Sequence, residues 1–129
     1  GCSQDPKEIH LGSDECAHCK MMITDPRFAA QIVTETGKAI SFDAIECMSG
    51  YYTAHADDLQ EAKRWVRNFN NPEQWMQVEE AVFVKSREIS SPMGESLLAL
   101  DTEVEAKQHL RQYPGEIVSW SQIIHNHSR

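Results

Sequence analysis

Apolar and polar residues alternate along the chain in a way that predicts a β-hairpin soon after residue 25. The apolar stretch 28–34 is typical of a strand, and Ala39–Phe42 predicts the strand that returns along it. Between them, Glu35–Lys38 predicts a tight turn in which Gly37 supplies a positive φ. The first element of structure expected in the chain is therefore this hairpin.

A helix and a further strand are predicted to follow the hairpin. Asp43 and Glu46 have the spacing of a capping box, in which the first residue caps the helix and the second bonds back. The apolar stripe of this helix has spacings of three and four residues and consists of Ala44, Cys47, Met48 and Tyr51. Residues 63–69 then alternate as a strand does, with Val66 facing away from its neighbours.

The second half of the chain repeats this order. Strands are predicted at 81–86 and 97–100, and a helix that begins at a Thr102–Glu105 capping box is predicted at 102–113. A further strand at 116–120 and the start of a final helix at 121–124 follow. The sequence therefore predicts an α+β fold of two strand–strand–helix–strand (ββαβ) units packed together, with small antiparallel or mixed sheets. The predicted divisions are a flexible N-terminal tether (1–15), a first ββαβ unit that includes a cysteine-rich loop (16–71) and a second ββαβ unit (72–129).

Length and charge narrow the class of protein. The 129 residues suffice for one domain, or for two small units that share a core, and 40% of them are apolar. The formal net charge of -8 argues against binding to nucleic acid and to an anionic membrane surface. An acidic protein of this kind is suited to a cation or to a basic partner.

The segment Cys16–Met22 concentrates sulfur ahead of the first strand. Its seven residues contain Cys16, Cys19, Met21 and Met22, and His18 lies among them. Thiolates and thioethers are soft ligands that select Cu(I), whereas zinc sites use Cys and His but not Met. The pattern indicates a monovalent copper site, but Cys-x-x-Cys is also compatible with a disulfide, a redox pair or buried packing.

A second methionine stands in a turn-rich segment of the other half. Pro92 and Gly94 flank Met93 in the long connection between two predicted strands. Such a loop leaves the methionine projecting, so its thioether is a candidate ligand if the two halves face one another. Packing into a gap in the core is the alternative.

The N-terminal residues bear on location. Gly1-Cys2 followed by a polar stretch resembles the end of a bacterial lipobox, after which Cys2 carries the lipid anchor. The alternative is a residue added by cloning next to an unmodified cysteine. A lipid anchor implies the cell envelope, where two of Cys16, Cys19 and Cys47 could form a disulfide and leave one thiol free.

The ordered set of these motifs resembles the NosL family of lipoprotein copper chaperones that serve nitrous oxide reductase. The resemblance runs from about residue 14 to residue 120 and is carried by the elements Cys16-x-x-Cys19-Lys-Met21, Asp25-Pro-Arg-Phe-Ala-Ala-Gln31, Phe42-Asp43-x-x-x-Cys47-Met48 and Ser91-Pro-Met93-Gly94. It implies Cu(I) binding, a periplasmic or envelope location with a lipid anchor, and delivery of copper to the reductase or its maturation machinery during assembly of the catalytic copper cluster. The family is not enzymatic.

The resemblance also implies particular ligands. The family's Cys-Gly-Met element falls on Cys19-Lys20-Met21, which makes Cys19 the thiolate ligand and Met21 a thioether ligand, while Pro-Met-Gly makes Met93 the second thioether. Lys20 replaces the family's glycine, so the loop must either differ from that of the family or tolerate a side chain there. Met22 is then an alternative to Met21 as the thioether ligand. Cys16 is a further candidate ligand.

Two other functions remain open from the sequence. A thiol–disulfide oxidoreductase of the cell envelope would use Cys16 and Cys19, although such pairs usually begin a helix after a buried strand. A zinc-binding or structural module would use the three cysteines and His18, but leaves the methionines unexplained. Cys47, on the apolar stripe of a helix, is interpreted as a buried inert thiol. The sequence does not give the oligomeric state.

Overall fold

The computed structural model describes residues 3–127, so the predicted lipidation site Cys2 lies outside the described residues. The strands are β1 (Ala30–Val33), β2 (Ala39–Phe42), β3 (Lys63–Asn68), β4 (Asn71–Gln77), β5 (Val82–Ser86), β6 (Leu97–Leu100) and β7 (Gly115–Val118). The helices are α1 (Ile45–Ala54), the short 3-10 helix η1 (Ala56–Asp58), α2 (Glu103–Gln112) and α3 (Trp120–His127). None of the helices in the described part of the chain is long and apolar enough to cross a membrane.

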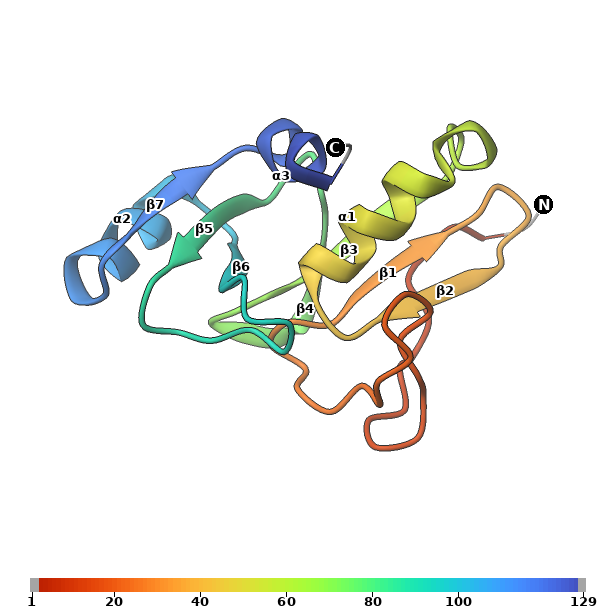
Figure 1. Ribbon diagram of the computed structural model, residues 1–129, viewed down its shortest axis with the longest axis horizontal. Coiled ribbons are helices and arrows are strands. Elements are labelled where there is room, and N and C mark those ends of the chain that lie inside the picture. Colours follow the sequence, from red (N-terminus) through yellow and green to blue (C-terminus); the bar gives the residue numbers. More distant parts are fainter. Residues whose placement is uncertain (1–2, 128–129) are drawn as a thin grey trace.

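The strands form two small antiparallel sheets, which confirms the predicted α+β class (Figure 1). The first sheet has the order β2-β1-β3-β4 and the second the order β6-β5-β7. Strand β4 was not expected, because its sequence NPEQWMQ is polar and contains proline. The sheet order explains this: β4 lies at an edge, where one side of the strand faces solvent and a proline removes no ladder hydrogen bond.

One hydrophobic core joins the two sheets. The backbone N–H of Phe69, just after β3, donates to the carbonyl of Ala99 in β6 at 2.8 Å. Side chains from both sheets and from α1 belong to the same buried cluster, among them Ile32, Val66, Met48, Phe83 and Leu97. Helix α1 lies beside α3, and α2 covers the second sheet on its outer side (Figure 1).

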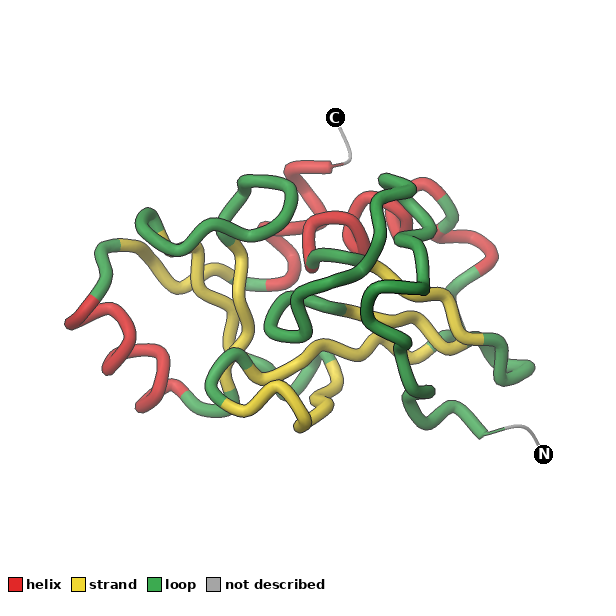
Figure 2. The backbone as a smooth tube through the Cα atoms, turned by 90° about the horizontal axis from the view of Figure 1, so that it is seen from below, coloured by secondary structure: helices red, strands yellow, loops and turns green. Residues whose placement is uncertain are grey.

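The N-terminal segment is bound to the first sheet. The sequence predicts a flexible tether over residues 1–15, whereas Gln4 and Lys7 hydrogen-bond to residues of β1 and β3. The N-terminal loop runs beside the strands of this sheet (Figure 2). The side chain of Gln31, fully buried in β1, accepts from the N–H of Lys7 at 2.7 Å and donates to its carbonyl at 3.1 Å. Trp65 donates its indole N–H to the carbonyl of Gln4 at 3.0 Å, and Ile9 is buried in the core. A buried amide that needs partners therefore fixes this segment.

Of the two predicted capping boxes, only the cap by Thr102 forms, and the carboxylate of Glu105 accepts from the N–H of Asp101 at 3.4 Å. The hydroxyl of Thr102 accepts from the N–H of Glu105 at 3.1 Å and caps α2. The prediction for Asp43 is wrong: the cap position of α1 is Ala44, and no side chain caps it. Glu46 does not bond back to the cap, because its carboxylate is used by a distant loop, described below. Asp43 and Glu46 therefore do not stabilise the N-terminus of α1 as a capping box would.

Candidate metal centre

The cysteine-rich loop is a closed turn fastened to the first sheet. The N–H of Cys16 donates to the carbonyl of Met21 at 2.8 Å, and the N–H of Lys20 returns to the carbonyl of Cys16 at 3.0 Å. The N–H of Ala17 donates to the carbonyl of Ser41 in β2 at 2.9 Å. These backbone bonds hold Cys16 against the sheet, where its side chain is fully buried.

Lys20 has a left-handed backbone, with φ of 68°. This conformation costs a residue with a Cβ atom about 1–2 kcal/mol, which explains why glycine suits the position. The ammonium group donates to the carbonyl of Ala17 at 3.0 Å across the turn. The loop in this protein therefore keeps the glycine-type geometry and carries a lysine in it.

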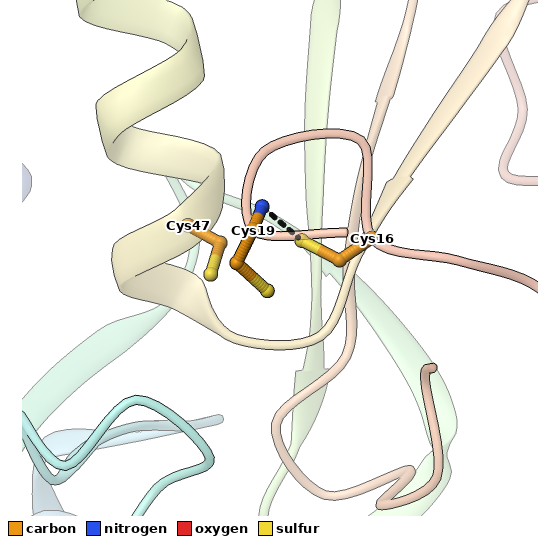
Figure 3. Close-up of side chains that lie close together, drawn as sticks. All are labelled: Cys16, Cys19 and Cys47. Atoms are coloured by element: carbon orange, nitrogen blue, oxygen red, sulfur yellow. Dashed lines mark hydrogen bonds between the residues drawn. The ribbon is translucent and has the colours of Figure 1, made fainter. Parts of the chain in front are cut away.

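The third cysteine comes from the first turn of α1. The ends of the β1–β2 hairpin are paired at Ala30 and Phe42, so the loop before β1 and the helix after β2 emerge side by side. This brings Cys47 to Cys16 and Cys19, and the three Sγ atoms all lie within 4.8 Å of one another (Figure 3). We call these residues the three-thiol cluster.

Burial differs among the three thiols. Cys16 is 0% exposed and Cys47 is 1% exposed, whereas Cys19 is only partly buried. The interpretation of Cys47 as a buried thiol is confirmed, but its place in the cluster was not anticipated. All three cysteines are free, with no disulfide in the part of the chain that the structure describes.

The cluster is arranged to hold one thiolate. The S–H of Cys47 donates to Cys16, and backbone N–H groups, including that of Cys19 at 3.4 Å, also point at this sulfur; together they lower the pKa of Cys16 to about 4 in spite of its burial. Donation to Cys16, together with burial, raises the pKa of Cys47. Burial raises the pKa of Cys19. The cluster therefore favours the thiolate at Cys16 over a thiolate at Cys19 or Cys47.

Two buried carboxyl groups, those of Asp43 and Glu46, belong to the segment that leads into the first turn of α1. Asp43 is 5% exposed, and burial, followed by the charge on Cys16, raises the pKa of its carboxyl. Glu46 is 2% exposed, and burial raises its pKa as well. Of the two, only the carboxyl of Asp43 is close enough to Cys16 for a charge on that sulfur to raise its pKa.

The methionines of the predicted site lie at the surface. Met21 is 61% exposed, Met22 50% and Met93 47%. Met22 pairs with Glu15 in an isolated antiparallel bridge, so Met21 and Met22 lie on the part of the loop that returns alongside Glu15. Met93 lies in the loop between β5 and β6, as the sequence predicts. Of the five predicted ligands, the structure brings Cys16 and Cys19 together and adds Cys47.

Three sulfurs at these separations are suited to a soft metal ion. With metal–sulfur bonds of about 2.3 Å, as in zinc thiolates, three sulfurs around one ion lie about 4 Å apart, close to the observed cluster. Thiolates favour Cu(I) among the biological metals, and thioethers nearby extend the same preference. Among the described residues no histidine or carboxylate completes the cluster as a fourth ligand of the kind structural zinc sites use.

Comparisons with known proteins identify relatives of this chain. A family model described as NosL matches residues 7–127. The crystal structure of the copper chaperone NosL from Shewanella denitrificans matches with a TM-score of 0.77 and 17% sequence identity, over 93% of this chain and 96% of that chain. At this identity the match shows a shared fold. A comparison with curated protein sequences found no significant match.

The backbone of Lys20 gives a prediction on stability. Lys20→Gly is expected to raise the free energy of unfolding by about 0.5–1 kcal/mol, because relief of left-handed strain exceeds the added entropy of glycine in the unfolded chain. Urea denaturation of the metal-free, reduced protein measures it. Lys20→Ala is the matched control, since it removes the ammonium but keeps the strain, and it should give no gain. An equal gain in both variants would contradict this explanation.

Proposed function

The chain belongs to the NosL family, and we propose that it is a Cu(I)-binding metallochaperone that delivers copper to nitrous oxide reductase while the catalytic copper cluster of that enzyme is assembled. The observation that carries the proposal is the three-thiol cluster, whose sulfurs lie within 4.8 Å of one another. It offers soft ligands, and the lowered pKa of Cys16 favours the thiolate form that binds metal, so it suits a soft monovalent cation.

The graded exposure of the sulfurs supports a carrier rather than a permanent site. Cys16 and Cys47 are buried, Cys19 is partly exposed, and the Met21, Met22 and Met93 thioethers are at the surface. We propose that copper enters and leaves past Cys19 and that the thioethers are the weaker ligands met on the way. Neutral thioethers bind Cu(I) without losing a proton, so they can capture and release it readily.

The alternative is a thiol–disulfide oxidoreductase that uses Cys16 and Cys19. A redox enzyme of this kind presents its low-pKa thiolate to the substrate disulfide. Here the thiol with the lowered pKa, Cys16, is fully buried, and the pKa of the more exposed Cys19 is raised. The geometry therefore favours metal binding over thiol exchange, and we propose a protein that is not an enzyme.

The function is tested by copper binding and transfer. The reduced protein should bind about one Cu(I) per chain in competition with a Cu(I) chelator and hold Zn(II) more weakly, because the ligands are soft. Copper-loaded protein mixed with copper-free nitrous oxide reductase should lose its copper to the enzyme, measured after the two are separated. Tighter retention of Zn(II) would overturn the copper assignment, and copper that stays on the carrier would overturn delivery to this partner.

Cys47 distinguishes the three-thiol cluster from a Cys16–Cys19 pair. Cys47→Ser should lower Cu(I) affinity tenfold or more, about 1.4 kcal/mol, whereas Met48→Leu, a control on the next buried sulfur, should change it little. Loading the wild-type protein at neutral pH should release about two protons per copper, one each from Cys19 and Cys47, and the Cys47→Ser variant about one. Calorimetry in buffers of different protonation enthalpy counts them. Release of about one proton by the wild-type protein would show that Cys47 stays a thiol and is not a ligand.

We propose further that the protein is held at a membrane of the cell envelope by lipid on Cys2. The support is the Gly1-Cys2 element and the polar residues after it. When the protein is expressed with a lipoprotein leader, the wild type should fractionate with membranes and carry acyl chains, because two or more chains anchor a protein stably. The Cys2→Ser variant should be unmodified and remain in the soluble fraction. An unmodified wild-type Cys2 would contradict the proposal.

A further inference from the structure

A buried carboxylate connects the helix that carries Cys47 to the loop that carries Met93. Glu46 is 2% exposed and precedes Cys47 in the first turn of α1. Its Oε2 atom accepts one hydrogen bond from the hydroxyl of Ser91 and a second from the N–H of Glu95 at 3.3 Å. These two partners stand on either side of Met93 in the sequence.

The loop is built around the same hydroxyl. The Oγ atom of Ser91 accepts from the N–H of Ser96 at 2.8 Å, and its carbonyl accepts from the N–H of Gly94 at 2.9 Å. Gly94 and Ser96 both have left-handed backbones, with φ of 82° and 61°. The turn is therefore sharp, and its shape depends on Ser91, which depends in turn on Glu46. Met93, at the tip, is 47% exposed.

A buried carboxylate is an expensive means of packing. Removing a carboxylate from water costs free energy unless hydrogen bonds compensate, and the Oε1 atom of Glu46 is buried with no hydrogen-bond partner in the described part of the chain. A leucine or methionine would fill the same volume at lower cost. What the carboxylate provides is an acceptor aimed at the hydroxyl of Ser91 and the N–H of Glu95.

We propose that Glu46 is a positioning residue of the metal centre: it holds the Met93 loop at the first turn of α1, so that the Met93 thioether reaches copper bound at the three-thiol cluster. The inference rests on the proposed copper function, and it assigns to Glu46 a role separate from that of the ligands. Figures 1 and 3 show the loop between β5 and β6 beside the end of α1 from which Cys47 projects. Glu46, which binds the Met93 loop, and Cys47 are therefore neighbouring residues in the first turn of α1.

A double-mutant cycle tests the proposal. In the wild-type background, Met93→Leu should lower Cu(I) affinity tenfold or more, and Glu46→Ala should lower it by a similar factor, because the loop no longer presents the thioether. In the Glu46→Ala background, Met93→Leu should then have no further effect. Losses that multiply in the double variant would show that Glu46 acts independently of Met93 and would overturn the proposal.

A conservative variant separates positioning from charge. Glu46→Gln keeps a carbonyl oxygen that accepts the same two hydrogen bonds, so it should restore wild-type affinity; a loss as large as that of Glu46→Ala would overturn the proposal. Ser91→Ala removes the hydroxyl from the loop side and should reproduce Glu46→Ala even if the latter folds poorly. Ser49→Ala is the control: its buried hydroxyl, on the same helix, bonds only to the backbone carbonyl of Glu46 at 2.9 Å, and affinity should be unchanged.

The Met93 methyl group reports directly on its position. With ¹³C-labelled methionine, the Met93 methyl resonance should shift when one equivalent of Cu(I) is added to the wild-type protein, and should not shift in Glu46→Ala or Ser91→Ala. A shift that persists in both variants would overturn the role of Glu46. If the wild-type protein binds no Cu(I), the proposed function itself fails; if it binds Cu(I) and Met93→Leu has no effect, only the positioning proposal fails.

Discussion

The antiparallel pairing of β1 with β2 is the constraint on which the metal centre depends. Because Ala30 pairs with Phe42, the chain enters the hairpin and leaves it at the same end. The loop that precedes β1 carries Cys16 and Cys19, and the helix that follows β2 carries Cys47 in its first turn. A change of register by one residue would turn the side chains of a strand to the other face and separate these elements. The three-thiol cluster therefore depends on this strand pairing and on the backbone bond between Ala17 and Ser41 that holds the cysteine-rich loop to β2.

Once assembled, the cluster is electrostatically unusual. The three thiols lie close together, and the hydrogen bonds converge on one sulfur, that of Cys16. Burial discourages charge on Asp43 and Glu46, and donation by Cys47 concentrates it on Cys16. A cation that enters this environment replaces the shared protons as the partner of the sulfurs.

The sequence predicted the elements of the fold that are specified by local features of their own residues. The strands 39–42 and 97–100 and the cap at Thr102 were predicted because apolar periodicity and a local hydrogen bond specify them. Strand β4 was missed because a polar edge strand owes its existence to the strand it pairs with. The cap at Asp43 was predicted wrongly because spacing alone does not show that Glu46 has a better partner 45 residues away in Ser91. For the same reason Cys47 was interpreted as inert packing: the periodicity marks its face as buried, but only the hairpin topology shows which thiols share that face.

The buried amide of Gln31 has a consequence for movement. Because Gln31 binds Lys7, and Trp65 and the carbonyl of Glu61 bind Gln4, the folded body begins almost at the N-terminus. A lipid on Cys2 would then be joined to the folded body by a connecting segment of about two residues, which spans roughly 7 Å. A free segment of thirteen residues, as the predicted tether would supply, could span roughly 45 Å. If Cys2 carries the proposed lipid, the protein would stay close to the bilayer and diffuse in its plane. Encounters with a recipient would then occur in two dimensions and at a nearly constant height, and the recipient would have to present its receiving surface close to the membrane.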